Sequence, residues 1–297
     1  MMRDGLLLID KPAGLTSHDV VNRVRRVTRL RQVGHAGTLD PLATGVLVVC
    51  LGQATRLSEY LLGHDKAYHA TIRLGLETNT YDASGEILAT HRVDLDRAEV
   101  ERALAQFVGE IQQVPPMYSA LKRGGQKLYE LARLGIEVER EARAVVIYSI
   151  ALRRYQAPDA LIEVKCSAGT YIRSLAHDLG VALGTGGHLT ELTRTASGPF
   201  TLDQALSLEA FEAMARTDQW PSCLRSMDDA LADWPQVTLD ANDRLRAMNG
   251  APLFKIPLTG TRCRAHDAQG RLVALLVFDQ KKQWWRAEKV FTMNHEP

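Results

Sequence analysis

One aspartate in this sequence stands in a setting that suits chemistry. Asp40 lies within residues 34–45, GHAGTLDPLATG, a stretch with three glycines and a proline in twelve residues. Glycine and proline at this density indicate a loop with special backbone angles. A polar loop held by a rigid scaffold is the usual construction of an active site. A connector whose aspartate only caps a turn is the other interpretation that composition allows.

The chemistry open to Asp40 is that of a carboxylate, because the ordinary pKa of aspartate is about 3.9. A carboxylate can act as a base, a nucleophile or a metal ligand. The loop holds no second acid for a metal site, and a glycosidase site would require a partner acid. Asp82 is the first candidate for that partner, but its turn setting favours a structural role. The residues therefore leave a lone carboxylate that attacks carbon, or an inert turn residue.

The elements predicted on either side would hold this loop against a core. Residues 46–51 form an apolar run that predicts a buried strand, and residues 5–10 predict a second one. Between them, valines at the spacing of one helix face follow Thr16 and Ser17, either of which can cap a helix. The other face of this helix and the residues just beyond it carry five arginines: Arg23, Arg25, Arg26, Arg29 and Arg31. They suit phosphate groups near Asp40, or they form a solvated face.

The next part of the chain predicts strands and a long loop. Apolar and polar residues alternate over 68–74, which indicates a half-buried strand with Tyr68 on its buried side. Residues 82–85 indicate a turn into a strand over 86–90, so a hairpin is expected. The segment 109–143 then carries a Pro-Pro and a Gly-Gly pair among several basic residues, with a short helix predicted inside it. A long insertion of this kind is usually functional or mobile.

Arg173 lies at the start of a predicted helix that follows two further strands. The strands are expected over 144–154 and 161–166, and the Gly169-Thr170 step is expected to cap the helix from Tyr171 to Leu183. A strand over 188–196 and a helix over 207–215 would follow. Strands and helices are mixed without a regular βαβ alternation, which favours the α+β class.

A break in charge indicates a second domain. Residues 201–234 hold seven acids and two arginines, whereas residues 242–289 hold ten lysines and arginines and four acids. A basic region of this kind fits a polyanion partner, or it is a solvated face of mixed charge. A hairpin predicted over 262–278 makes this region β-rich. We expect a first domain of residues 1–236, which includes the 109–143 insertion, and a second of residues 237–297.

Composition narrows the functional classes. The chain has 297 residues, of which 45% are hydrophobic and 24% charged, an ordinary balance for a globular protein. The four cysteines form no CxxC pair and the nine histidines show no ligand spacing, so no metal is expected. No P-loop or GxGxxG motif calls for a nucleotide cofactor. The apolar runs are too short for a membrane span and the N-terminus lacks a signal peptide, so we expect a cytoplasmic protein without membrane contact.

The motif GHAGTLDPLATGVL resembles the catalytic motif of the TruB family of tRNA pseudouridine synthases. Further pieces resemble the family in the same order: Lys11-Pro12 with Gly14 and Thr16-Ser17, Lys66-Ala67-Tyr68, Arg73-Leu74-Gly75, PPMYSALK over 115–122, and GTYIRSL over 169–175. The resemblance runs from residue 5 to residue 200 and more weakly to the end. It implies a mixed-sheet catalytic domain, an insertion over 109–143 that closes over an RNA stem, and a small C-terminal RNA-binding domain of PUA type.

The resemblance also implies a reaction without a cofactor. An aspartate in this motif starts the isomerisation of uridine to pseudouridine, in which the bond from C1′ to N1 breaks and C1′ bonds to C5. Asp40 matches that aspartate, and Arg173 matches an arginine that would pair with it and keep it charged. Tyr68 matches a tyrosine that stacks on the target base. Tyr171 and Leu192 match residues of the uracil pocket.

His35 matches a histidine that fills space near the extruded nucleotide, whose extrusion costs a few kcal/mol. Asn79 stands where many family members have an aspartate, so the role of the stretch up to Asp82 is less well defined by the resemblance. We expect a stand-alone monomer that modifies uridine 55 in the T stem-loop of tRNA without guide RNA. The alternatives are a non-catalytic RNA-binding or RNA-folding protein on the same scaffold, and a related synthase that modifies another RNA.

Overall fold

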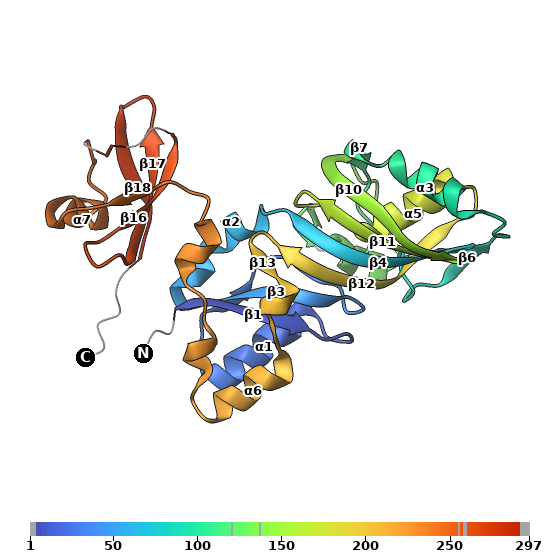
Figure 1. Ribbon diagram of the computed structural model, residues 1–297, viewed down its shortest axis with the longest axis horizontal. Helices are drawn as coiled ribbons and strands as arrows, with labels where there is room; N and C mark the ends of the chain where they lie inside the picture. The colour runs from blue at the N-terminus through green and yellow to red at the C-terminus, as the bar shows by residue number, and fades with distance from the viewer. Residues whose placement is uncertain (1–3, 120, 137, 255, 258–259, 292–297) are drawn as a thin grey trace.

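The computed structural model describes residues 4–119, 121–136, 138–254, 256–257 and 260–291. Its main feature is a mixed sheet of ten strands: β1 (Gly5–Lys11), β2 (Val33–His35), β3 (Thr44–Leu51), β4 (Lys66–Leu74), β7 (Gly109–Gln113), β10 (Arg143–Gln156), β11 (Asp159–Cys166), β12 (Gly187–Ser197), β13 (Phe200–Thr201) and β14 (Leu206–Ser207). The strand order is β14-β1-β3-β12-β4-β11-β10-β7, with β2 beside β3 and β13 beside β12 (Figure 1). The predicted α+β class with a mixed sheet is confirmed.

Helices and 3₁₀ turns connect the strands of this sheet. They are α1 (Ser17–Thr28), α2 (Ser58–Leu62), α3 (Arg97–Ala105), α4 (Leu128–Arg133), α5 (Ile172–Ala182) and α6 (Leu208–Arg216), with 3₁₀ turns η1 (Gly52–Leu57), η2 (Leu202–Gln204), η3 (Trp220–Cys223) and η4 (Met227–Leu231). As predicted, Thr16 caps α1, and its side chain accepts a hydrogen bond from the backbone of Asp19. None of the described helices is long and apolar enough to cross a membrane.

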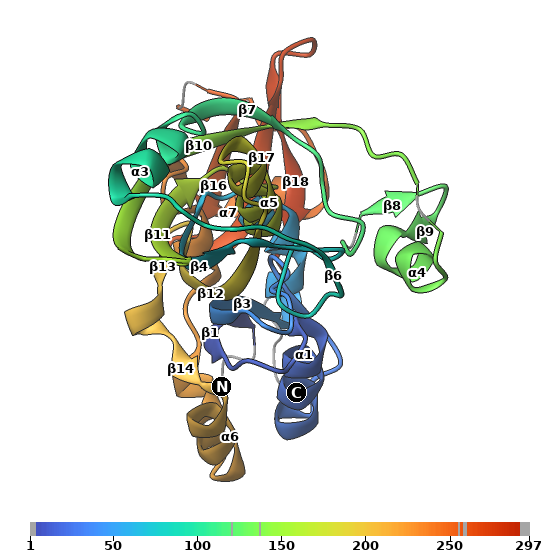
Figure 2. The ribbon, with the colours of Figure 1, turned by 90° about the vertical axis from the view of Figure 1, so that its right-hand side faces the viewer.

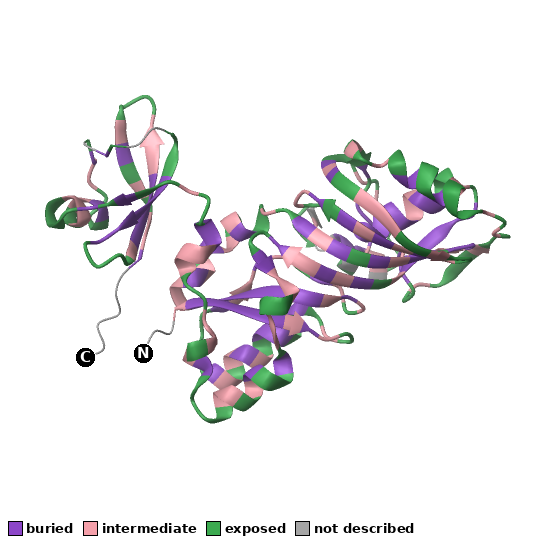
Figure 3. Ribbon diagram, in the orientation of Figure 1, coloured by how far each residue is buried: buried purple, intermediate pink, exposed green. Residues whose placement is uncertain are grey.

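The strands β1 and β3 form a rigid support directly behind the Asp40 loop. They pair without a break from Gly5 opposite Leu51 to Lys11 opposite Gly45. Alternate side chains enter two different core clusters, so both faces of these strands are buried (Figure 3). This explains why both sequences are continuous apolar runs.

The predicted strand over 68–74 is confirmed, but the hairpin that follows it differs from expectation. The strand β6 (Ile87–Thr90) pairs with the short strand β5 (Leu76–Thr78) in a separate two-stranded sheet. Gly75, with φ +91°, stands between β4 and β5 and turns the chain out of the large sheet. The turn containing Asp82 is thereby brought to β12, where Asp82 forms a parallel bridge with Leu189.

Two further boundaries differ from expectation. Residues 109–113, predicted as the beginning of the insertion, form β7 and pair with β10, so the segment outside the sheet begins after Gln113. Within it, β8 (Lys122–Arg123), β9 (Gln126–Lys127) and α4 stand away from the sheet (Figure 2). The predicted cap of α5 at Gly169-Thr170 is wrong, because the Thr170 hydroxyl donates to the carbonyl of Ser167 and Tyr171 is the N-cap residue.

The C-terminal part has its own sheet of four strands. In order these are β15 (Gln236–Thr238), β16 (Arg262–His266), β17 (Leu272–Asp279) and β18 (Trp284–Val290), with α7 (Ala241–Met248) packed beside them (Figure 1). The predicted hairpin is β16–β17, and the expected β-rich C-terminal domain is present. It contacts the first part through the Tyr60 hydroxyl, which donates to Glu288 at 2.8 Å. The domain limits at residues 236 and 237 stay a prediction.

Replacing Gly45 with alanine should destabilise the fold by about 2–5 kcal/mol. Gly45 has φ +98°, and a Cβ added there would lie 2.2 Å from the backbone oxygen of Arg194. Gly14→Ala is the matched control, because Gly14 has φ +84° but no atom within 4 Å of an added Cβ. Urea unfolding should show the larger loss for Gly45→Ala. Equal losses for the two variants would show that the close approach of the strands contributes nothing.

Candidate active site

The Asp40 loop is fixed on both sides by hydrogen bonds to the N-terminal region. The Ser17 hydroxyl accepts from the backbone nitrogen of Leu39 at 2.8 Å and donates to its carbonyl at 3.1 Å. The backbone nitrogen of Gly14 donates to the carbonyl of Pro41 at 2.7 Å. Asp40 is therefore held between two anchored neighbours, which is the rigid placement expected from the glycine-rich motif.

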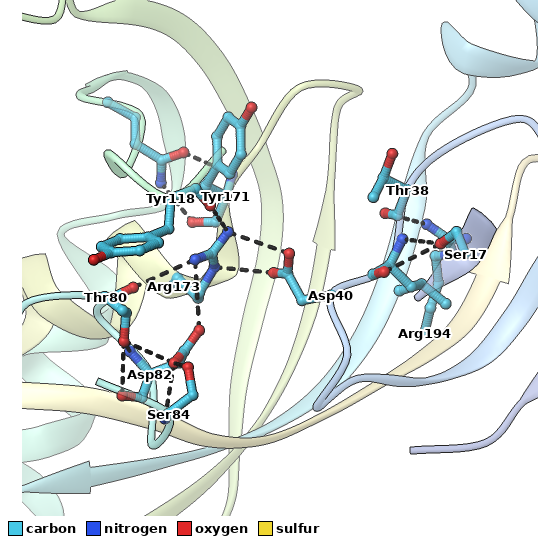
Figure 4. Close-up of polar contacts among 12 residues, drawn as sticks. Ser17, Thr38, Asp40, Thr80, Asp82, Ser84, Tyr118, Tyr171, Arg173 and Arg194 are labelled. Atoms are coloured by element: carbon cyan, nitrogen blue, oxygen red, sulfur yellow. Dashed lines mark hydrogen bonds and ion pairs between the residues drawn. The ribbon is translucent and has the colours of Figure 1, made fainter. Parts of the chain in front are cut away.

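Arg173 meets Asp40 side-on. Its Nε lies 2.9 Å from Oδ2 of Asp40, and its Nη2 donates to Oδ1 at 3.3 Å (Figure 4). Arg173 is buried, whereas the side chain of Asp40 keeps 33% of its surface exposed. Because two parallel contacts orient the carboxylate, its exposed side faces a molecule arriving from solvent in a defined direction.

Asp82 lies on the other side of Arg173. The sequence analysis had favoured a structural role for it in a turn. Its Oδ2 is 3.5 Å from Nη1 of Arg173, and only 3% of the residue is exposed. Its Oδ1 accepts hydrogen bonds from the Thr80 hydroxyl at 2.8 Å and the Ser84 backbone at 2.9 Å. Asp82 is thus both a turn residue and the second carboxylate against Arg173. Asn79 also serves this turn, where its side chain accepts from the Glu86 backbone at 3.0 Å.

Backbone carbonyls complete the surroundings of the Arg173 guanidinium. Nη2 donates to the carbonyl of Tyr118 at 2.7 Å, and Nη1 donates to that of Thr80 at 3.4 Å. The start of α5, which carries Arg173, is fixed by Gln113. That amide accepts from the Tyr171 nitrogen at 2.7 Å and donates to the Tyr171 carbonyl at 3.0 Å. Segments distant in sequence therefore determine where the guanidinium lies.

Burial raises the pKa of Asp40 above its ordinary value. The Arg173 charge opposes this rise, the Asp82 charge adds to it, and Lys11 opposes it. The charge of Asp40 therefore depends on Asp82 and Lys11 as well as on Arg173, the partner that the resemblance implied. Lys11, which sequence reasoning did not single out for this site, is fully buried with its amine on the carbonyls of Pro12 and Leu15, and burial lowers its pKa to about 8.

Two tyrosines lie within electrostatic range of Asp40. Tyr68 is 8% exposed on β4 and belongs to the core cluster that contains Leu39 and Leu192. Burial raises the pKa of Tyr68 and of Tyr171, and the Asp40 charge contributes to the rise for both. Both phenols are therefore neutral at pH 7.

His35 and Leu192 occupy the strands that flank this centre. His35 ends β2 opposite Val49, and Leu192 lies on β12 opposite Ala70, where it is 7% exposed. Burial lowers the pKa of His35, which is therefore a neutral imidazole at pH 7. In the described part of the chain, no hydrogen bond or ion pair joins either residue to Asp40. The structure thus places Tyr68, Tyr171 and Arg173 within electrostatic range of Asp40, puts Leu192 in the core cluster of Tyr68, and places His35 within range of Arg194.

Of the two carboxylates at this site, that of Asp40 is partly exposed and that of Asp82 is buried. Among the described residues, no three histidine, cysteine or acidic side chains gather as metal ligands. The two carboxylates, Asp40 and Asp82, already share the Arg173 cation. A carboxylate held in this way can act on a carbon atom or on a proton of a bound molecule.

Comparisons with known proteins identify the class. Residues 25–172 match the model described as the TruB family pseudouridylate synthase N-terminal domain. Residues 173–232 match that of the tRNA pseudouridylate synthase B C-terminal domain. The chain therefore belongs to the TruB family of pseudouridylate synthases.

Curated relatives and solved structures agree with this assignment. The chain is 49% identical over 279 residues to tRNA pseudouridine synthase B of Burkholderia pseudomallei (strain 668), covering 92% of each protein. It is 52% identical to the protein of the same name from Aromatoleum aromaticum, covering 80% of this chain and 77% of that one. A solved Cbf5-Nop10-Gar1 complex contains a chain with TM-score 0.77 and 29% identity, over 98% of this chain and 85% of the other.

Proposed function

We propose that this protein isomerises uridine 55 in the T loop of tRNA to pseudouridine, with Asp40 as the group that starts the reaction. The observation that carries the proposal is the side-on ion pair of Asp40 with the buried Arg173, because it leaves one oriented and partly exposed carboxylate. The relatives named tRNA pseudouridine synthase B, one of which is 49% identical over 92% of the chain, support tRNA as the substrate.

The reaction is a rearrangement that requires no added electrons or energy. The bond from C1′ to N1 breaks, the uracil turns, C1′ bonds to C5, the proton leaves C5, and N1 gains a proton. Arg173 fixes the direction of the Asp40 carboxylate throughout. Tyr68 presents a neutral ring for stacking, which is worth about 1–3 kcal/mol per base. Tyr171, Leu192 and His35 border the space proposed for the nucleotide.

The decisive test is release of tritium from a tRNA transcript labelled at uracil C5. The hydrogen at C5 is exchanged when C5 bonds to the sugar, so its release reports isomerisation. We expect one equivalent per tRNA from position 55, with no release from a transcript that carries cytidine there. Tight binding without any release would identify a non-catalytic RNA-binding protein, and release from another position would identify a synthase with a different target.

We further propose that residues 237–297 form a PUA-like RNA-binding domain of a cytoplasmic monomer. Residues 242–289 carry ten lysines and arginines against four acids, which suits contact with phosphates. Lys281, Lys282 and Arg286 are exposed there. The solved complex named above contains Nop10 and Gar1, whereas we propose that this chain acts without partner proteins or guide RNA.

Neutralising Lys281, Lys282 and Arg286 to glutamine should weaken tRNA binding and leave kcat unchanged. Each lost phosphate contact should reduce the slope of log K against log salt by about 0.7–0.9. Point changes suit this test better than truncation, because Leu275 and Phe291 pack in a core cluster with residues of the first part of the chain. The control neutralises arginines paired with acids: Arg92, Arg97 and Arg153. Equal salt slopes for both triple variants would refute the basic surface as a phosphate contact.

Exhaustive chelation of divalent metal should leave activity intact on tRNA that was folded beforehand. The reason is that the described part of the site offers two carboxylates already paired with Arg173 and no ligand cluster. The measurement is tritium release with and without EDTA, and native gels check that the tRNA stays folded. Loss of activity that zinc restores would contradict the prediction.

A further inference from the structure

Arg194 is a buried cation that the proposed reaction does not yet use. It is 1% exposed on β12, and its guanidinium donates three hydrogen bonds to backbone carbonyls. Nε donates to Val46 at 2.7 Å, and Nη2 donates to Gly37 at 3.1 Å. Nη1 donates to Thr38 at 3.4 Å (Figure 4). No carboxylate pairs with it within the described ranges. A fully buried arginine is normally paired with an acid, so this arrangement calls for a reason.

The carbonyls that Arg194 holds belong to the loop that carries Asp40. Gly37 and Thr38 lie just before Asp40, and Val46 lies just after the loop, on β3. One guanidinium therefore spans both ends of the loop. Because an arginine fork is planar and rigid, it fixes the distance between these ends as a flexible lysine would not.

Arg194 is also the cross-strand neighbour of Tyr68. Arg194 lies opposite Tyr68 in the pairing of β12 with β4, and opposite Gly45 in the pairing of β12 with β3. The Arg194 charge also acts on the Tyr68 phenol, where it opposes the rise in pKa that burial causes. The register of β12 against β4 shifts directly after Arg194, and bulges of this kind re-aim side chains. Arg194 thus joins the loop of Asp40 to the ring of Tyr68.

We propose that Arg194 is a positioning residue that sets the placement of Asp40 relative to Tyr68. The inference rests on the proposed isomerisation, in which the base must stack on Tyr68 while the Asp40 carboxylate reaches the nucleoside. A displacement of about 1 Å between such groups can lower the rate about 100-fold. Phosphate contacts elsewhere bind the RNA, so the effect should fall on kcat rather than on binding.

The test compares Arg194→Met, Arg194→Lys and a control, Arg264→Met. Arg264 is also buried, at 9% exposure, and donates to the carbonyls of Trp234, Asp228 and Ala232. It differs from Arg194 in that it also pairs with the Asp228 carboxylate at 3.1 Å and belongs to the C-terminal sheet. Each variant is purified as the full chain, its melting temperature is measured, and kcat and KM are determined by tritium release from folded tRNA below that temperature.

We expect Arg194→Met to lower kcat by about 100-fold with KM changed by less than about threefold. Arg194→Lys should recover part of kcat, because it keeps the charge but loses the fork. In Arg194→Ala, added guanidinium should raise kcat, and equal urea, which has a similar shape but no charge, should not. Arg264→Met should lower the melting temperature without changing kcat.

A folded Arg194→Met variant with wild-type kcat would overturn the inference, as would equal loss of kcat in Arg264→Met. If Arg194→Met does not fold, Arg194→Lys decides the matter: a lower kcat at unchanged KM supports the inference, and an unchanged kcat overturns it. Failure of the proposed function is distinguishable, because the wild-type protein would then release no tritium from tRNA.

Discussion

Replacing Asp40 with asparagine should lower isomerisation by roughly 10³-fold or more while leaving tRNA binding nearly unchanged. Asparagine keeps the size of the side chain and one oxygen that can accept from Arg173. It loses the charge and the nucleophilic oxygen that the reaction requires. The loop should hold its form, because Ser17, Gly14 and Arg194 bond to backbone atoms rather than to the Asp40 side chain.

The stability of Asp40→Asn should differ little from that of the wild type. Burial raises the pKa of Asp40, so the folded state disfavours its ionised form, and removing the charge relieves that effect. The loss of the ion pair with Arg173 acts in the opposite direction. Unfolding by urea at pH 7 measures the balance of these two effects.

A matched control separates loss of chemistry from loss of an aspartate–arginine pair. Asp159 pairs with Arg73 through two contacts of 2.8 Å on the exposed part of the sheet. Asp159→Asn should therefore release tritium at the wild-type rate. If Asp40→Asn did the same, Asp40 would be only a turn residue, and the assignment of the site would be lost.

Local sequence patterns were sufficient to predict most of the scaffold. The apolar run of β3, the alternation of β4 and the capping of α1 by Thr16 each depend on neighbouring residues, and each is present in the structure. The start of α5 was wrong because Tyr171 is held by Gln113, which no local pattern shows. The same applies to β7, whose polar sequence becomes a strand only through its partner β10.

The candidate site was also predictable only in part, because contacts between residues distant in sequence build much of it. The glycine-rich motif indicated Asp40, and resemblance indicated Arg173. Asp82 looked like a turn residue because it is one, and its second oxygen meets an arginine 91 positions later. Lys11 and Arg194 each stand two residues after a buried apolar residue of the same strand, Ile9 and Leu192, and their roles come from carbonyls and charges brought together by the sheet. A cation at an inward-facing position of a strand is the signal that could have indicated them.

Replacing Arg173 with methionine should remove activity and also destabilise the fold by about 3–5 kcal/mol. Arg173 is the cation between Asp40 and Asp82, and its loss leaves Asp82 buried at 3% exposure without an opposite charge. Arg173→Lys should lose less, because it keeps the charge but cannot meet Asp40 through two contacts. A second change, Asp82→Asn, added to Arg173→Met should restore part of the stability and none of the activity.

The pH dependence of kcat provides a second, independent comparison of Arg173→Lys with the wild type. Activity requires ionised Asp40, so kcat should fall as the pH decreases through the pKa of that carboxyl. Burial places this fall above the ordinary value of about 3.9, and Arg173 opposes the shift. A lysine at position 173 would approach Asp40 less closely and would oppose the rise in its pKa less than arginine does. The fall of kcat at low pH, the acid limb of the profile, should therefore move to higher pH in the variant. The profile is measured by tritium release under single-turnover conditions. An acid limb that stays in place, together with wild-type stability in Arg173→Met, would show that Arg173 holds neither carboxylate in the active protein.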